Sequence, residues 1–355
     1  MAADGLDVAV LVPGANLRYL TGLSTGPSER LFLGLVSSEG PLHFLVPGLE
    51  RPAIERAPAA SEIVVHSYRD DEGPIAGLAQ LAQNLDLKRS TVGVEYGRMR
   101  VHELRALEHH APSASIVDLG PTAMELRQIK DADEIDALRR AVALTEDLLS
   151  AMIDAIEPGV TERDIVRVYE RARIASDCEA VPFSPIVASG SNTDSPHAQP
   201  GERRLQTGDL ITIDCGAVID GYPGDITRNI ALGEIDAERE RIHQVVLDAN
   251  AAGREACRPG AAAEHVDRAA RAVIDAAGYG EYFMHRTGHG LGLDVHEPPD
   301  ITAGSDEVLT PGMAFTVEPG VYLPGVGGAR VEDDMLITAD GAESLTRFPR
   351  DLVRR

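Results

Sequence analysis

The chain has 355 residues, of which 43% are apolar, 33 are basic and 57 are acidic. That length exceeds what one hydrophobic core usually serves, so two domains are expected, and the apolar fraction excludes a disordered chain. The formal net charge of -24 argues against nucleic acid and against an anionic membrane as partners.

The chain start and the cysteines indicate the cellular compartment. Residues 1–5 lack the basic start of a signal peptide, and no apolar run reaches the ~18 residues of a membrane helix. The three cysteines, Cys178, Cys215 and Cys257, are widely spaced and match neither a disulfide framework nor a zinc motif. We therefore expect a soluble, cytoplasmic protein with free thiols.

The first third of the chain alternates short apolar runs with amphipathic stretches. The amphipathic stretches predict helices such as 75–83 and 102–109. The apolar runs predict strands at 8–12, 31–36, 42–46, 63–66 and 91–95. This alternation predicts an α/β domain over residues 1–123.

Helical periodicity dominates the next part of the chain. Apolar residues recur every three or four positions over 130–156, which predicts a long amphipathic helix that a Pro-Gly pair ends. A second helix is expected after Thr161, a residue type that caps helices. Two more helices follow a predicted hairpin, at 238–256 and 262–277. The second domain, 124–355, thus repeats the order helix, helix, strands, which hints at an internal duplication.

Residues 210–232 have the pattern of a β-hairpin, since two apolar runs flank an Asp-Gly turn signal. Asp214 lies inside the first strand, where a carboxylate is costly unless it is paired or bound to a metal. Asp225 lies on the second strand and shares a face with Thr227, because strand side chains alternate with period two. The hairpin can direct both carboxylates to one point with Thr227 in support, although solvated aspartates on an edge hairpin give the same pattern.

Three of the eleven histidines, His285, His289 and His296, fall within twelve positions. Gly288 and Gly290 disfavour a helix there, so the spacing does not indicate the helical histidine pair of zinc proteases. We expect a loop that leads into a strand, in which glycine lets the backbone approach a ligand closely. This density of histidines favours a functional site over isolated structural histidines.

Two further strands are expected near the end of the chain, each with a glutamate where an apolar residue would be usual. These glutamates are Glu318 and Glu332. Arg330 lies two residues before Glu332 and shares its face, either as part of a site or as a plain salt-bridge partner.

Together these segments supply four carboxylates and one imidazole, from Asp214, Asp225, His289, Glu318 and Glu332. Such a set suits two divalent cations about 3.5–4 Å apart. Oxygen-rich ligands favour Mn²⁺ or Co²⁺, with Zn²⁺ possible. Two cations also offset clustered negative charge that would otherwise raise the carboxylate pKa values.

These residues, in their contexts, resemble the pita-bread metallopeptidases, which comprise methionine aminopeptidases, aminopeptidase P, prolidase and the metal-free creatinases. Weaker matches, NLRYLTG from Asn16 and ELRQIK from Glu125, extend the resemblance over nearly the whole chain. The specific matches are DCGA from Asp214, GDITR from Gly224, GHGLGLDVHE from Gly288, TVEPG from Thr316 and RVED from Arg330. The resemblance implies an α/β amino-terminal domain followed by an α+β pita-bread catalytic domain. The large first domain indicates the proline-specific branch.

The resemblance also implies roles for single residues. The five ligands would hold two metals that activate a water, and Glu318 would relay a proton to the leaving nitrogen. His197 matches a histidine near the free amine of the substrate, and Arg330 matches an arginine that orients the site. His285 and His296 match histidines that hydrogen-bond the substrate and the developing oxyanion. These roles imply hydrolysis of the bond before a proline in short peptides.

One position bears on the choice between a dipeptidase and an aminopeptidase. Prolidases often carry an arginine shortly after the His-Glu-Xaa-Pro string, where it binds the carboxylate of the dipeptide. Here Asp300 stands in that region and would repel a carboxylate. We therefore favour an Xaa-Pro aminopeptidase over an Xaa-Pro dipeptidase (prolidase), unless another arginine substitutes.

Two other classes remain as alternatives, a metal-free creatinase-like hydrolase and a peptidase-dead binding module. All five ligand positions are filled, which weighs against both. Relatives of this kind commonly form homodimers, so a homodimer is expected.

Overall fold

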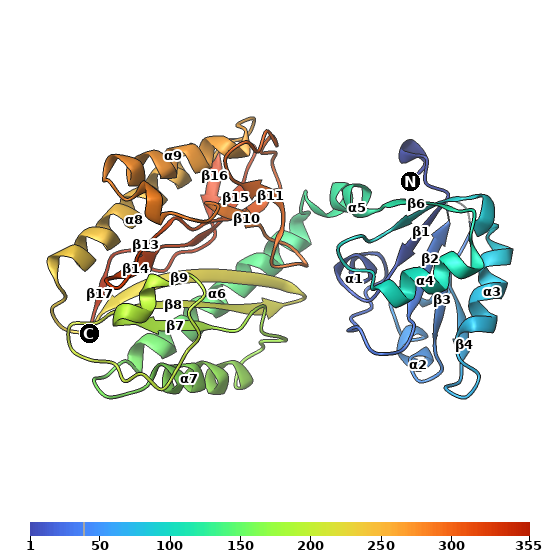
Figure 1. Ribbon diagram of the computed structural model, residues 1–355, viewed down its shortest axis with the longest axis horizontal. Coiled ribbons are helices and arrows are strands. Elements are labelled where there is room, and N and C mark those ends of the chain that lie inside the picture. The colour runs from blue at the N-terminus through green and yellow to red at the C-terminus, as the bar shows by residue number, and fades with distance from the viewer. Residues whose placement is uncertain (38–39) are drawn as a thin grey trace. The chain divides into compact units, whose positions relative to one another are not determined.

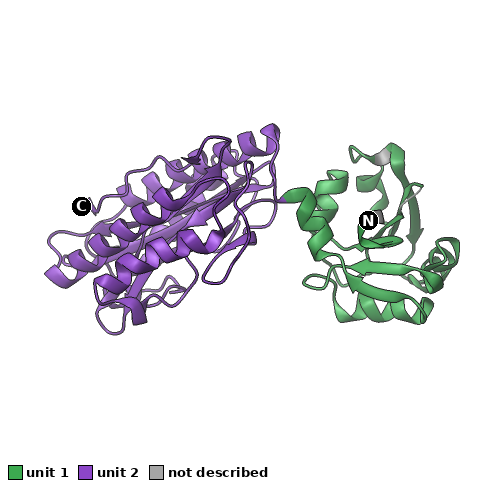
Figure 2. Ribbon diagram, turned by 90° about the horizontal axis from the view of Figure 1, so that it is seen from above, with its two compact units in different colours: residues 1–127 green, residues 128–355 purple. Residues whose placement is uncertain are grey.

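The computed structural model describes residues 1–37 and 40–355, and the chain separates into two compact units, Met1–Arg127 and Gln128–Arg355 (Figure 2). The sequence placed the boundary after residue 123, inside helix α5 (Gly120–Arg127). This whole helix packs with the first unit, because Ala123 lies in that unit's core and Arg127 donates to Asn16 Oδ1 over 2.6 Å. The compact boundary therefore follows α5.

The first unit is a six-stranded mixed sheet flanked by helices, as an α/β domain requires. The sheet order is β4-β3-β2-β1-β5-β6. Its strands are β1 (Val8–Leu11), β2 (Leu33–Ser37), β3 (Leu42–Pro47), β4 (Ile63–Tyr68), β5 (Thr91–Val94) and β6 (Ser115–Asp118). Its helices are α1 (Ala15–Thr21), α2 (Arg51–Ile54), α3 (Ile75–Asn84), α4 (Val101–His110) and α5. Val10 and Leu11 belong to different apolar clusters, so the alternating side chains of β1 pack on both faces of the sheet.

The second unit combines three small sheets with four long helices (Figure 1). The sheet orders are β17-β9-β8-β7, β11-β10-β12-β15-β16 and β13-β14. Its helices are α6 (Ala132–Asp154), α7 (Glu162–Ile174), α8 (Ala237–Ala256) and α9 (Ala263–Ala276). Its strands are β7 (Ile186–Ser189), β8 (Leu210–Ile219), β9 (Tyr222–Ala231), β10 (Gly288–Gly290), β11 (Glu297–Ile301), β12 (Ala314–Val317), β13 (Gly320–Leu323), β14 (Gly327–Arg330), β15 (Asp333–Ile337), β16 (Ala342–Ser344) and β17 (Val353–Arg354).

The expected order of helix, helix and strands occurs twice in this unit, as α6-α7-β7-β8-β9 and as α8-α9 followed by β10 onward. Helix α7 begins at the expected cap, since the Thr161 side chain accepts a hydrogen bond from Asp164 N and the Asp164 carboxylate bonds back. None of the helices in the described ranges is long and apolar enough to cross a membrane.

The β8–β9 hairpin positions the two aspartates. Asp220 and Gly221 both have positive φ, 50° and 87°, as a two-residue turn demands. The register pairs Asp214 with Thr227 across the two strands. Helix α6 packs against both strands, with Val142 in the same apolar cluster as the hairpin residues.

The structure differs from the sequence analysis at the two glutamates. Glu318 and Glu332 do not lie inside strands; Glu318 follows β12 and Glu332 precedes β15. The chain leaves the five-stranded sheet after β12, forms the β13–β14 ribbon and returns at β15. The glutamates occupy these crossover points, where the side-chain alternation of a strand no longer applies.

Candidate metal centre

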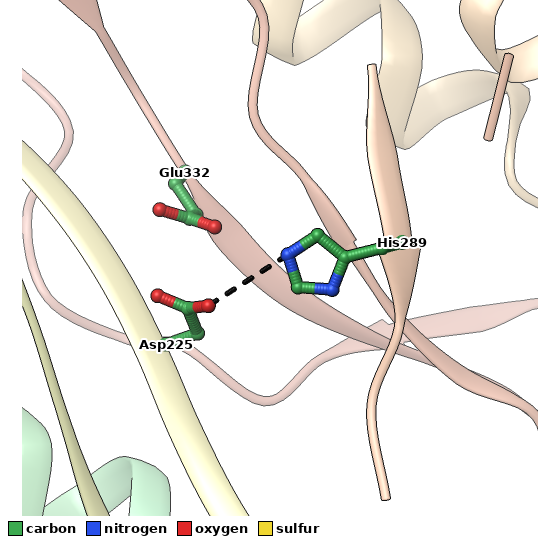
Figure 3. A group of neighbouring side chains, drawn as sticks. All are labelled: Asp225, His289 and Glu332. Atoms are coloured by element: carbon green, nitrogen blue, oxygen red, sulfur yellow. Dashed lines mark ion pairs between the residues drawn. The ribbon is translucent and has the colours of Figure 1, made fainter. Parts of the chain in front are cut away.

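Asp225, His289 and Glu332 form the central group of this site (Figure 3). All three are buried, and one candidate ligand atom of each lies within 4.8 Å of the others. They come from β9, β10 and the residue before β15. His289 Nε2 lies 3.8 Å from Asp225 Oδ2 and 3.3 Å from Glu318 Oε1, so a fourth side chain faces the same point.

His289 is held in the form that binds metal ions. Its Nδ1 lies 3.2 Å from the carbonyl oxygen of Gly290, which can only accept, so Nδ1 carries the proton. Nε2 then carries the free lone pair of the ring, and this atom faces Asp225 and Glu318. Burial lowers the pKa of His289 to about 3, which keeps the imidazole neutral. A ligating histidine that donates its other N–H to a carbonyl is the usual arrangement in metal sites.

Asp214 joins the group through Arg330. Arg330 Nη2 donates to Asp214 Oδ2 over 2.6 Å, and the second carboxylate oxygen, Oδ1, is buried with no hydrogen-bond partner among the described residues. Thr227 links the other side, because its hydroxyl donates to Glu332 Oε2 over 2.6 Å and accepts from Arg330 Nε over 3.0 Å. Thr227 thus connects Glu332 with Arg330 through its hydroxyl.

The clustered carboxylates are electrostatically strained without a cation. Burial, and then the neighbouring carboxylates, raise the pKa values of Asp225 and Glu332 well above their usual range. Burial also raises the pKa of Glu318 to about 7. Divalent cations would supply the missing positive charge. Asp214 Oδ1, which has no hydrogen-bond partner among the described residues, could coordinate such a cation. The residues present therefore fit a carboxylate-rich metal site.

The cluster lies at the bottom of a pocket of about 510 Å³. Phe183 and Ile186 add apolar surface to the wall. The His296 ring lies 4.1 Å from the His289 ring, centroid to centroid. Every residue expected as a ligand or catalytic group lines the pocket: His197, Asp214, Asp225, His285, His289, His296, Glu318, Arg330 and Glu332. Thr227 lies behind the ligands, where it is fully buried.

Tyr322 is a part of the site to which the sequence analysis assigned no role. Its hydroxyl accepts from Arg330 Nη1 over 2.9 Å and lies 3.0 Å from His285 Nε2. His285 Nδ1 donates to the carbonyl of Arg286 over 2.7 Å, and burial lowers the His285 pKa to about 4. The neutral ring therefore accepts the Tyr322 proton at Nε2, so both of its nitrogens are already engaged within the protein. The only signal in the sequence was a tyrosine four residues after Glu318.

Arg286 is a second unassigned residue in the pocket wall. It forms an ion pair with Asp300, the residue that the sequence analysis took as repelling a carboxylate. The pairing follows from the strand register, in which Gly288 of β10 faces Ile301 of β11. Sequence spacing alone could not show this partner, because the two residues are fourteen positions apart, with Arg286 in the segment before β10 and Asp300 on β11.

The family model described as metallopeptidase family M24 matches residues 136–339, more than half of the chain. The chain belongs to metallopeptidase family M24. The model of the creatinase/prolidase N-terminal domain matches residues 1–129. Membership confirms the expected enzyme class and its dependence on metal.

Solved structures of similar proteins agree with this assignment. A dipeptidase from Pyrococcus horikoshii OT3 is 39% identical, with a TM-score of 0.93 over 100% of this chain and 97% of its own. A recombinant prolidase from Thermococcus sibiricus is 34% identical, with a TM-score of 0.95 over 100% and 96%. An Xaa-Pro dipeptidase from Bacillus anthracis is 33% identical, with a TM-score of 0.89 over 100% and 96%. They confirm the pita-bread fold and the proline-specific branch for this M24 chain.

Proposed function

We propose that this M24 chain is a dinuclear metal-dependent Xaa-Pro dipeptidase (prolidase). Judged by its own charge, Asp300 favoured an Xaa-Pro aminopeptidase. Two observations now support the dipeptidase instead. The three similar structures described above carry the names dipeptidase, prolidase and Xaa-Pro dipeptidase. Arg286 also provides the pocket with a guanidinium whose ion pair offsets the charge of Asp300.

The observation that carries the proposal is the position of Arg286. A dipeptide ends in a carboxylate directly after the proline, and a planar guanidinium is the side chain that binds carboxylates best. Arg286 is only partly exposed, at 35% of its side chain, and lies beside His285 in the pocket wall. An incoming carboxylate would exchange with Asp300 for the same guanidinium. A longer peptide has no carboxylate directly after the proline and therefore forms no ion pair with Arg286.

The remaining residues have the following proposed roles. When bound, two divalent cations, Mn²⁺ in our proposal with Co²⁺ and Zn²⁺ as alternatives, supply an activated water and polarise the scissile carbonyl. Glu318 passes a proton to the proline nitrogen. His296 hydrogen-bonds the peptide, and His285 does so by exchanging its hydrogen bond with Tyr322 for one with the peptide. His197 faces the free amine of the peptide. Arg330 fixes the orientation of Asp214.

The test compares Ala-Pro with Ala-Pro-Ala after metal loading. We expect faster turnover of the dipeptide. Arg286→Ala should lower its kcat/KM by roughly 10–150-fold, the value of a hydrogen-bonded charge, and affect the tripeptide little. Asp300→Ala should raise dipeptide turnover. Arg268→Ala, at an exposed arginine of α9 paired with Glu264, is the matched control. Faster cleavage of the tripeptide by the wild-type chain would restore the aminopeptidase assignment.

Three further properties belong to the same proposal. We infer a cytoplasmic homodimer that acts on short proline-containing peptides, without nucleic acid or membrane partners. The three cysteines are unpaired, in keeping with a reducing compartment. Light scattering tests the dimer, since a monomer mass contradicts it. Metal analysis of protein purified without chelator tests the preference for Mn²⁺.

A further inference from the structure

Glu162 is a buried carboxylate outside the metal centre. It is the first residue of α7 and is fully inaccessible to solvent, and none of its hydrogen bonds within the described ranges goes to an expected metal ligand. Within the described ranges, all the hydrogen bonds to its carboxylate come from neutral donors, which belong to Ser189, Asn192 and Gly201. A buried carboxylate in such a position is costly unless the donors around it are fixed in place.

The donors around Glu162 come from both ends of one loop. Ser189, at the end of β7, donates to Glu162 Oε1 from its backbone nitrogen over 2.9 Å and from its hydroxyl over 2.7 Å. Gly201 N donates to Oε2 over 3.0 Å. Asn192 Nδ2, within the loop, donates to Oε1 over 3.0 Å. Residues 190–200 therefore form a closed loop whose two ends meet at a single carboxylate.

This loop forms part of the wall of the metal-site pocket. Pro196, His197 and Gln199 all line the pocket, and the His197 side chain is exposed there. The far side of the loop is fixed to the β13–β14 ribbon, because Asp194 accepts from Gly325 N over 2.9 Å and Thr193 accepts from Gly328 N over 2.9 Å. The ribbon holds the middle of the loop, and Glu162 holds its two ends.

We propose that Glu162 is a positioning residue for peptide hydrolysis, which fastens both ends of loop 190–200 and thereby holds His197 at the pocket. The proposal rests on the proposed function for its kinetic part only. Glu162→Gln keeps the size of the side chain but turns one acceptor into an N–H donor. That donor would face the N–H of either Ser189 or Gly201, so one end of the loop is released.

Two measurements on the full-length, metal-loaded protein test the proposal. Hydrogen exchange of Glu162→Gln should be faster in residues 190–200 and unchanged in β8 and β9. Its kcat/KM for Ala-Pro should fall by about 10–100-fold with unchanged metal content, since an ångström of displacement can cost that much. Glu202→Gln, an exposed glutamate paired with Arg163, is the matched control and should change neither. Asn192→Ala removes one donor to Glu162 without bringing two N–H groups face to face. It should therefore change exchange and kcat/KM in the same direction, but by less.

A double-mutant cycle separates positioning from general destabilisation. In a His197→Ala background, Glu162→Gln should lower kcat/KM by less than about twofold, because the imidazole that Glu162 positions is absent. An equal cost in both backgrounds, or unchanged exchange in the loop, overturns the proposal. If the wild-type chain cleaves no Xaa-Pro peptide, the proposed function and the kinetic role fail together, whereas the exchange result still decides whether Glu162 holds the loop.

Discussion

Lys130 and Glu297 form an ion pair in the interior of the catalytic unit, and substitution of the lysine alone should lower the melting temperature measurably. Lys130 is one of only two lysines in the chain. Its Nζ lies 2.6 Å from Glu297 Oε1, and the two side chains are 1% and 2% exposed. Glu297 follows His296 and pairs with Gly290, next to His289. The pair therefore holds the start of β11, directly after the loop that connects two histidines of the pocket.

Lys130→Met would remove the ammonium group that contacts Glu297 Oε1, while the Glu297 carboxylate stays buried. Breaking a buried pair from one side costs about 3–5 kcal/mol. For a domain of this size, 1 kcal/mol corresponds to about 2–4 °C, so the melting transition of the catalytic unit should fall by roughly 6–20 °C. Differential scanning calorimetry of the metal-free chain measures this shift without contributions from bound cations. Lys88→Met, at an exposed lysine of the first unit, is the matched control.

A double variant, Lys130→Met with Glu297→Leu, checks the physical reason. It removes both charges, so most of the lost stability should return, as happens when apolar residues replace buried ion pairs. The reasoning is refuted if Lys130→Met shifts the transition by less than about 2 °C, which is below 1 kcal/mol at this size. It is also refuted if the double variant melts no higher than the single one.

Three other outcomes are expected. Thr227→Val removes the hydrogen bonds to Glu332 and Arg330 and should weaken metal affinity by about 10–100-fold at unchanged fold, as measured by metal titration; unchanged affinity would exclude this role. Chelation should abolish Ala-Pro hydrolysis and Mn²⁺ should restore it, whereas activity that persists without metal points to a creatinase-like reaction. Burial lowers the pKa of His243 to about 4, so this imidazole takes up a proton more readily in the unfolded chain than in the folded one. The folded protein therefore loses stability as the pH falls from about 6.5 to 4. His243→Leu should remove up to about 3 kcal/mol of that loss in urea unfolding at graded pH, and an identical pH slope would contradict it.

The β8–β9 hairpin shows what could be predicted from the sequence. Its turn, its register and the direction of Asp214 and Asp225 follow from period-two alternation and an Asp-Gly pair, which are local properties. Glu318 and Glu332 were expected within strands, but the structure places them where the chain passes between sheets. A local pattern of apolar residues cannot reveal where a strand changes partners, because that choice depends on segments distant in the sequence.

Long-range pairs limited the functional prediction in the same way. Asp300 was assessed by its own charge, and the opposite charge of Arg286 changes the conclusion about substrate length. Glu162 could be recognised from the sequence only as an acidic residue near a helix start. Its importance comes from donors 27 and 39 residues away, which only the folded chain brings to it.

The glycines that flank His289 also decide where this pocket can be redesigned. A methyl group on Gly288 would overlap the carbonyl oxygen of Thr316, and one on Gly290 would overlap that of Pro298. Backbone therefore surrounds the histidine on both sides, and codons 288 and 290 should stay fixed in any library. Diversity is better introduced at Phe183, Ser184 and Gln199, where loops form the wall and new side chains can change which peptides enter.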